Sequence, residues 1–219
     1  MSDTEQKITI KNREFTYNPQ KLEHNTSSAK LNIDIAKSNL LIFNKIARAN
    51  DFRFILFFGT LLGAVREHDF IKNDTDIDVI TADEEGLLNI IPTLQENGFL
   101  FIRYYSSKTR TIYSFSKDSV YIDVYLAKKA GKNHYYLCGA KTPDSFIENC
   151  QTVDFIGESF VIPSEYEKIL SMLYGKDWRI PQDKPSKFPI TSRRDYTQLI
   201  IQFFPKKFRN WVKKIIGVK

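Results

Sequence analysis

The first regular pattern along the chain is a stripe of hydrophobic residues between positions 31 and 47. These residues recur at the spacing of one helix face, which predicts a long helix that ends near Ala49. Ser27 and Ser28 precede the stripe, and either hydroxyl can cap the first turn of the helix.

Strand-like and helical patterns then alternate. The apolar run FRFILFF at 52–58 predicts a buried strand, which leads directly into Gly59 and a short helical stretch, TLLGAVRE. IDVIT at 77–81 predicts a second strand. A helix is expected from about 83 to 97, with Gly98 at its C-terminal end.

The remaining elements complete a mixed pattern. Three β-rich runs lie between about 99 and 127. Further on, IPSEYEKILSMLYG predicts a helix in which Ser164 and Glu167 match a capping box and Gly175 matches a C-cap. Strands interspersed with helices predict a mixed β-sheet flanked by helices, and therefore an α/β or α+β fold.

Composition supports an ordinary folded domain. The chain has 219 residues, of which 42% are hydrophobic and 14% aromatic, so it can bury a core without disulfide staples. The 17 Phe and 11 Tyr residues exclude a disordered chain, and the 9 Gly and 8 Pro residues are too few for a collagen-like or low-complexity one. Two cysteines suit a reducing compartment, and neither a signal peptide nor an apolar run of about 18 residues is present. We expect one domain over residues 1–204 and a cytoplasmic location.

The net charge of +6 is concentrated in one segment. Residues 205–219 hold six of the 32 basic residues and no acidic one, which leaves 26 basic and 26 acidic residues in the rest. A balanced body argues against nucleic-acid binding. Phe208, Trp211 and Ile215 share one helical face opposite the lysines, as in helices that lie on a membrane surface. Docking of this face on the domain's own core is the alternative.

Acidic residues make the most specific pattern. Asp76 and Asp78 alternate with Ile77 and Val79, so on a strand both carboxylates point to one face while the apolar residues enter the core. Adjacent carboxylates repel unless a cation lies between them, and Mg²⁺, with Mn²⁺ as the alternative, prefers such oxygen ligands. Asp123 lies within the apolar run VYIDVYLA and reaches the same ion if its strand pairs beside 77–81.

A second feature precedes these acids. Gly59 and Thr60 stand where a buried strand opens into a helix, and such a turn offers backbone N–H groups and a hydroxyl to a phosphate. A phosphate cradle with three carboxylates predicts metal-assisted phosphoryl transfer. The order Gly-Thr, Asp-x-Asp and a later strand Asp resembles the nucleotidyltransferase fold.

Two blocks of sequence carry a closer resemblance. GTLLGAVREHDFIKNDTDIDV (59–79) resembles the first signature of the LicD family, to which fukutin-like proteins are related. VIPSEYEKILSMLYGKDWRIPQ (161–182) is similar to its second signature. Lys72 and Asn73 stand where the family usually has Pro-Trp, and Thr75 replaces the middle acid of the Asp run. These departures affect the identity of the donor more than the class of reaction.

The resemblance implies transfer of a substituted phosphate, such as phosphocholine or a polyol phosphate, from a CDP-linked donor to a sugar hydroxyl of a glycan or glycolipid. Asp76 and Asp78 then hold the metal, and Asp123 is either a third ligand or the general base. The residues expected to bind substrate are Gly59, Thr60, Arg66, Lys72 and Asp74.

Several alternatives stay open at this stage. Arg66 can instead pair with the neighbours of Glu67. Arg103, Arg110 and Tyr113 either bind substrate or face solvent from the predicted strands. The enzyme can transfer a nucleotide from an NTP rather than a substituted phosphate. The third alternative is not an enzyme but an inactive domain that binds glycan or membrane. In such a domain, Asp76, Asp78 and Asp123 would have no catalytic role.

Overall fold

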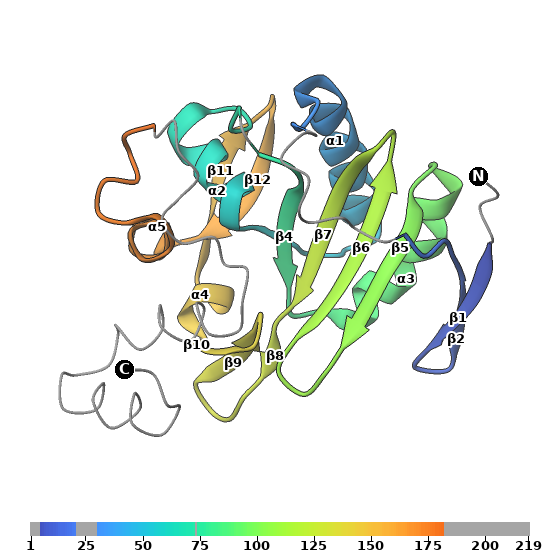
Figure 1. The fold of residues 1–219 in the computed structure, drawn as a ribbon. Helices are drawn as coiled ribbons and strands as arrows, with labels where there is room; N and C mark the ends of the chain where they lie inside the picture. The colour runs from blue at the N-terminus through green and yellow to red at the C-terminus, as the bar shows by residue number, and fades with distance from the viewer. Residues whose placement is uncertain (1–4, 21–29, 73, 182–219) are drawn as a thin grey trace.

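The computed structural model describes residues 5–20, 30–72 and 74–181 (Figure 1). A five-stranded sheet forms its centre, with neighbouring strands in the order β3-β4-β7-β6-β5. Only β4 and β7 run parallel; the other pairs are antiparallel. The predicted mixed sheet is therefore confirmed. The bounds are β3 (Ile55–Leu56), β4 (Ile77–Thr81), β5 (Leu100–Ser106), β6 (Thr111–Lys117) and β7 (Val120–Leu126).

Two helices, α1 (Ile33–Ala49) and α3 (Glu84–Glu96), cover the sheet face that lies behind in Figure 1. Fully buried side chains of α1, such as Phe43, pack there against apolar residues of the sheet. The predicted end of α1 at Ala49 is confirmed, but the predicted cap is wrong. Asn32 caps the helix by accepting the Ile35 N–H at 3.3 Å, and Ser27 and Ser28 lie outside the described residues.

The strand predicted over 52–58 shrinks to two residues. After Leu56 the Phe57 N–H still donates to the Asp78 carbonyl at 3.1 Å, but Phe58 turns to a positive φ of 44° and starts α2 (Phe58–Leu62). Phe54 is buried beside Phe43 without being in a strand. A buried irregular segment is as apolar as a strand, which explains the error. The chain continues from α2 as a π-helical turn, η1 (Gly63–Glu67).

A hairpin and a helix extend the domain beyond β3. The hairpin joins β11 (Cys150–Phe155) to β12 (Glu158–Pro163), and β12 lies against β3. Helix α5 (Tyr166–Tyr174) follows and contacts α2. Gly175 ends α5 at a φ of 97°, as predicted, but no side chain caps its start. Glu167, assigned to a capping box with Ser164, pairs with Arg179 instead.

The other elements lie at the edges of the sheet. The hairpin of β1 (Gln6–Ile10) and β2 (Arg13–Tyr17) projects at one side, as Figure 1 shows. A second small sheet, with α4 (Ser145–Glu148) nearby, comprises β8 (Lys128–Lys129), β9 (His134–Leu137) and β10 (Ala140–Pro143).

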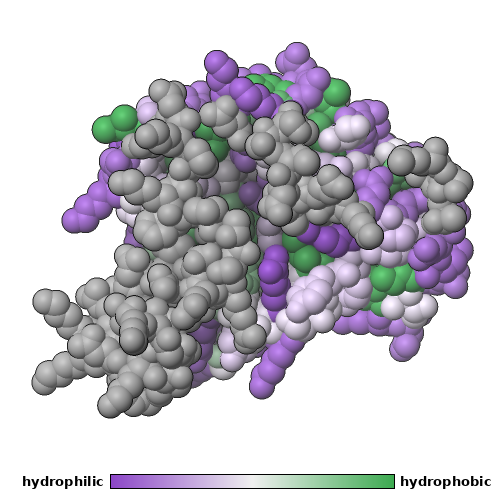
Figure 2. Space-filling model, in the orientation of Figure 1, coloured by the Kyte–Doolittle hydropathy of each residue, from purple (hydrophilic) through white to green (hydrophobic). Residues whose placement is uncertain are grey.

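Apolar residues on the visible surface form small, separate patches among hydrophilic ones (Figure 2). Within the described ranges, no helix has both the length and the hydrophobicity needed to cross a membrane. The predicted tail, residues 205–219, lies outside the described part of the chain, as does the domain boundary at 204.

Candidate functional site

Strand pairing brings three aspartates together. Asp78 on β4 is the direct parallel partner of Asp123 on β7, and Asp76 stands just before β4. One carboxylate oxygen from each residue lies within 4.8 Å of those of the other two. The pairing of the Asp123 strand beside 77–81, on which the predicted metal site depended, is therefore present.

Alternation along the two strands explains why the carboxylates share a face. Ile77 and Val79 are fully buried on the side covered by helices, and so are Ile122 and Val124 on β7. Residues between them must point to the opposite face of the sheet. Because β4 and β7 are central strands, Asp78 and Asp123 are themselves largely removed from solvent.

The negative charge of the cluster is compensated only in part, by the pairing of Arg103 with Asp123 at 2.6 Å. Burial raises the pKa of Asp76 to about 6, with a further contribution from the Asp123 charge. Burial and the charges of Asp76, Asp74 and Asp123 hold the pKa of Asp78 well above its ordinary value. Carboxylates that repel one another in a buried place are stabilised by a divalent cation, and their oxygens are the ligands that Mg²⁺ or Mn²⁺ accepts. These three residues fit such an ion.

Asp74 adds a fourth carboxylate next to the triad. Burial, followed by the charge of Asp76, raises the pKa of Asp74 to about 7. Its Oδ1 accepts the Thr75 N–H at 3.2 Å, whereas its buried Oδ2 has no partner among the described residues. A Cβ atom on Gly59 would stand 2.4 Å from that oxygen. A side chain at position 59, in the predicted phosphate-binding turn, would therefore require the Asp74 carboxylate to move.

Thr60 links the same turn to the strand of the aspartates. Its side chain is fully buried, and its Oγ1 accepts the N–H of Asp78 at 2.9 Å. This contact fixes the turn relative to β4, so the hydroxyl has a structural partner that the sequence did not reveal. Contact of Gly59 and Thr60 with a phosphate stays a prediction.

Arg66 and Lys72 take different positions. Arg66 lies in η1, where its Nε pairs with Glu67 at 2.7 Å and its Nη1 donates to the Trp178 carbonyl at 3.0 Å. An ion pair of Arg66 is therefore present, with Glu67 itself rather than with a neighbour of Glu67. Contact of Arg66 with a phosphate stays a prediction. Lys72 is exposed in the loop between η1 and β4.

Two tyrosines near the cluster were missed. Tyr125 donates from its hydroxyl to Asp123 Oδ2 at 3.4 Å, and its position two residues after Asp123 on a strand could have indicated the shared face. Burial, followed by the charges of Asp78, Asp74 and Asp76, raises the pKa of Tyr174 on α5. No local pattern in the sequence signals this influence.

Of the arginine and tyrosine candidates, only one lies at the aspartate cluster in the described structure. Arg103 on β5 pairs with Asp123 at 2.6 Å and belongs to the site. Tyr113 was expected near the site but lies on the other face of the sheet, because it alternates with Ser114 and donates to Glu84 at 2.8 Å. Arg110 stands in the loop between β5 and β6 rather than on a strand.

Comparison with known proteins adds three findings. No curated protein gives a significant match to this chain. Among solved structures, it is similar to the antibiotic-resistance factor ANT(2'')-Ia, with a TM-score of 0.46, 14% sequence identity, and coverage of 84% of this chain and 92% of that one. The family model described as "LicD/FKTN/FKRP, nucleotidyltransferase domain" matches residues 51–165.

The matched residues include the Gly59–Thr60 turn and the aspartates from Asp74 to Asp123. Most of the second signature, 161–182, lies beyond them. The match spans more than half of the 219 residues. The chain therefore carries a transferase domain of the phosphotransferase or nucleotidyltransferase type, and it belongs to the LicD family.

Proposed function

We propose that the protein catalyses metal-dependent transfer of a substituted phosphate from a CDP-linked donor to a sugar hydroxyl of a cell-surface glycan or lipid-linked oligosaccharide. The observation that carries this proposal is the buried cluster of Asp76, Asp78 and Asp123 beside the Gly59–Thr60 turn. Both lie within the residues matched by the LicD family model.

Asp76, Asp78 and Asp123 would hold Mg²⁺ or Mn²⁺, which supplies Lewis-acid stabilisation of the charge that develops on the phosphate oxygens. The donor diphosphate binds along the Gly59–Thr60 turn, with Arg66 and Lys72 as the nearby cations and Asp74 at its border. Asp123 suits a ligand better than a base, because Arg103 already occupies its Oδ2 at 2.6 Å.

The reaction itself is a displacement at phosphorus. The acceptor hydroxyl oxygen forms a bond to the β-phosphorus, and the bond from that phosphorus to the oxygen of CMP breaks. CMP leaves with the bonding electrons, and the hydroxyl proton is accepted by a carboxylate or by water. The chain's contribution is to align donor and acceptor and to keep the phosphate charge compensated.

A donor survey tests this proposal. Purified protein is incubated with CDP-choline, CDP-ethanolamine, CDP-glycerol or CDP-ribitol and a crude cell-envelope glycan, and CMP is measured with and without Mg²⁺. We expect CMP from one donor only, abolished by chelation and by Asp76→Asn. Glu85→Gln, which neutralises an exposed acid at the far end of β4, is the matched control and should retain turnover. CMP formation by Asp76→Asn at the wild-type rate would contradict the assignment.

Transfer of a nucleotide from an NTP is the second candidate, and the description of the matched family model as a nucleotidyltransferase domain favours keeping it. Attack then occurs at the α-phosphorus and pyrophosphate is released instead of CMP. Measuring both products in the same incubations separates the two reactions. If neither product forms with any donor, the result favours the hypothesis of an inactive domain that binds glycan or membrane.

The basic tail, residues 205–219, is proposed to bring the enzyme to the inner face of a membrane that carries the acceptor. Flotation with vesicles of anionic and of neutral phospholipid tests this. We expect binding to the anionic vesicles that falls with salt and is lost when the chain ends at residue 204. Equal flotation of the shortened chain would exclude the tail as the contact.

A further inference from the structure

Four polar residues form one row across the central sheet. Asp78 pairs with Asp123 between β4 and β7, Asp123 pairs with Ser114 between β7 and β6, and Ser114 pairs with Arg103 between β6 and β5. Direct cross-strand partners point to the same face of a sheet. The row therefore connects the candidate metal site to the edge strand β5.

A β-bulge puts Arg103 in this row. The register between β5 and β6 shifts between Phe101 and Arg103, so that Ile102 is the extra residue. Phe101 and Tyr104 both face the helix-covered side, where they lie beside Tyr113. In a regular strand Arg103 would share the face of Phe101. Bulges commonly redirect side chains next to active sites.

Arg103 makes two bonds along the row. Its Nη2 pairs with Asp123 Oδ2 at 2.6 Å, and its Nε donates to Ser114 Oγ at 2.8 Å. The Tyr125 hydroxyl approaches the same oxygen of Asp123 at 3.4 Å. Asp123 Oδ1, by contrast, is buried and has no hydrogen-bond partner in the described structure. The two oxygens of one carboxylate thus have opposite surroundings.

We propose that Arg103 is a positioning residue for the metal site. It holds Asp123 by Oδ2 so that Oδ1 remains available to the cation, and the Ile102 bulge exists to aim Arg103 at that oxygen. This inference rests on the proposed function, since it requires that Asp76, Asp78 and Asp123 bind a metal. Residues that orient metal ligands typically change metal affinity 10–100-fold when they are removed.

A different role for Arg103, as a simple counter-charge, predicts the opposite change in metal affinity. If Arg103 were only a counter-charge that the metal displaces, its removal would leave a more negative site and Mn²⁺ would bind more tightly. If Arg103 positions Asp123, its removal weakens Mn²⁺ binding although a positive charge has gone. The direction of the change therefore decides between the two roles.

The experiment is a titration of the full chain with Mn²⁺ alone, in which free Mn²⁺ is measured by electron paramagnetic resonance. We expect Arg103→Met to weaken Mn²⁺ affinity about 10–100-fold and Arg103→Lys, which keeps the charge, to weaken it less. Arg13→Met is the matched control, because Arg13 is also ion-paired, to Glu85, on the remote β1–β2 hairpin. It should bind within about twofold of wild type.

Each outcome is decisive. Affinity of Arg103→Met within twofold of wild type, or tighter, overturns the positioning role. If circular dichroism finds Arg103→Met unfolded, Ser114→Ala replaces it, since that variant keeps the arginine and removes only its Nε partner; unchanged affinity there overturns the role as well. Failure of the wild-type chain to bind Mn²⁺ contradicts the metal site itself, and so the proposed function.

Discussion

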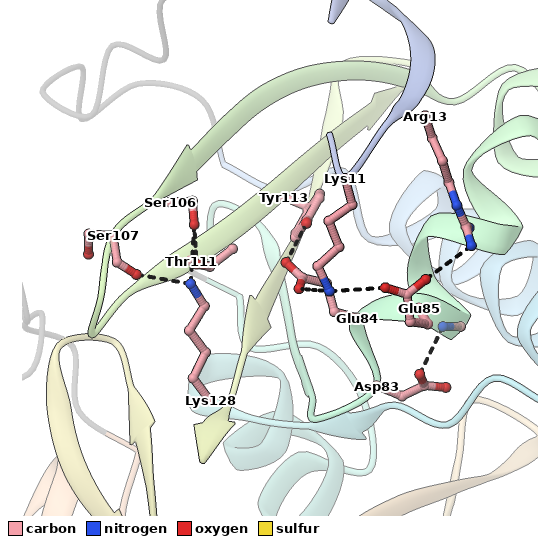
Figure 3. Close-up of polar contacts among 11 residues, drawn as sticks. Lys11, Arg13, Asp83, Glu84, Glu85, Ser106, Ser107, Thr111, Tyr113 and Lys128 are labelled. Carbon is pink, nitrogen blue, oxygen red and sulfur yellow. Dashed lines mark hydrogen bonds and ion pairs between the residues drawn. The ribbon is translucent and has the colours of Figure 1, made fainter. Parts of the chain in front are cut away.

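The two ends of β4 are both acidic, yet they differ in how the charge is held. At the start of the strand, Asp76 and Asp78 lie close to Asp123, and Arg103 pairs with Asp123. After its end comes a second run of acids, residues 83–85, in which every carboxylate has a partner. Figure 3 shows these partners converging from the β1–β2 hairpin, β6 and α3.

The partners at the second end are specific. Asp83 caps α3 by accepting the Gly86 N–H at 2.8 Å. Glu84 accepts the Tyr113 hydroxyl at 2.8 Å and pairs with Lys11 at 2.6 Å. Glu85 pairs with Lys11 and with Arg13, each at 3.0 Å. Lys11 lowers the pKa of the Glu85 carboxyl, whereas burial raises the pKa of Asp76 and Asp78.

Acidity alone therefore does not identify a site in this chain. At the first end, the carboxylates repel one another in a buried place, and Arg103 offsets only part of that energetic cost. At the second end, the carboxylates attach a hairpin and cap a helix. Changes that neutralise one acid at each end should consequently have opposite effects on stability.

Asp78→Asn has the largest expected effect. Turnover should fall by about 10³-fold or more, since a metal site contributes several kcal/mol to the transition state. In the metal-free protein at pH 8, the same change removes a buried like charge and should raise the free energy of unfolding by about 1–3 kcal/mol. Urea unfolding in the presence of chelator measures this. A lower midpoint would mean that the Asp78 carboxylate is already balanced within the chain.

The pH dependence of stability is the second test. The folded-state pKa values of Asp76 and Asp74, about 6 and about 7, lie above the ordinary value. The folded chain therefore keeps protons that the unfolded chain releases, and this stabilisation is complete below about pH 4 and lost as the pH rises through 6 and 7. Metal-free protein should become less stable between pH 5 and pH 8.

Mn²⁺ should reverse that loss, because it replaces the protons. At saturating Mn²⁺ we expect the melting temperature to rise by about 5–10 °C at pH 8 and hardly at all at pH 5. Mg²⁺ serves as the second ion and NaCl of equal ionic strength as the control. A shift of equal size at both pH values would place the ion elsewhere on the protein.

The sequence predicted this site because alternation decides which face a strand residue occupies. Ile77, Asp78 and Val79 on one strand, and Asp123 within an apolar run on another, suffice to bring the carboxylates together once the strands pair. Arg103 could not be assigned in this way. Its face depends on a bulge at Ile102, and no glycine or proline in LFIRYYS indicates that bulge.

Other features could not be predicted from the sequence because they depend on contacts between distant parts of the chain. Helix α5, which carries Tyr174, packs on α2, and no local pattern in the sequence indicates that contact. A buried irregular segment around Phe54 has the same hydrophobicity as a strand. The Thr60 hydroxyl accepts the Asp78 N–H from 18 positions away, a contact that depends on how the turn folds back on β4. Period and composition describe local structure, whereas these features are properties of the assembled fold.

The smallest expected effects come from the second end of β4. An open cleft of about 450 Å³ lies there, lined in part by Lys11, Glu84, Lys128 and Tyr135, so its acids need a direct test of function. Glu84→Gln should lower the free energy of unfolding by about 1 kcal/mol, because the half-buried Lys11 pair is lost while the amide oxygen can still accept from Tyr113.

Glu85→Gln, at a more exposed carboxylate, should change the unfolding free energy less than Glu84→Gln does, because solvent screens surface ion pairs. Both variants should turn over donor at the wild-type rate, since their partners are structural. Urea unfolding and CMP release, measured on the same preparations, check the two statements together. Loss of turnover in Glu84→Gln without loss of stability would contradict the assignment of a purely structural role to these acids. It would mean that the cleft at this end of β4 takes part in the reaction.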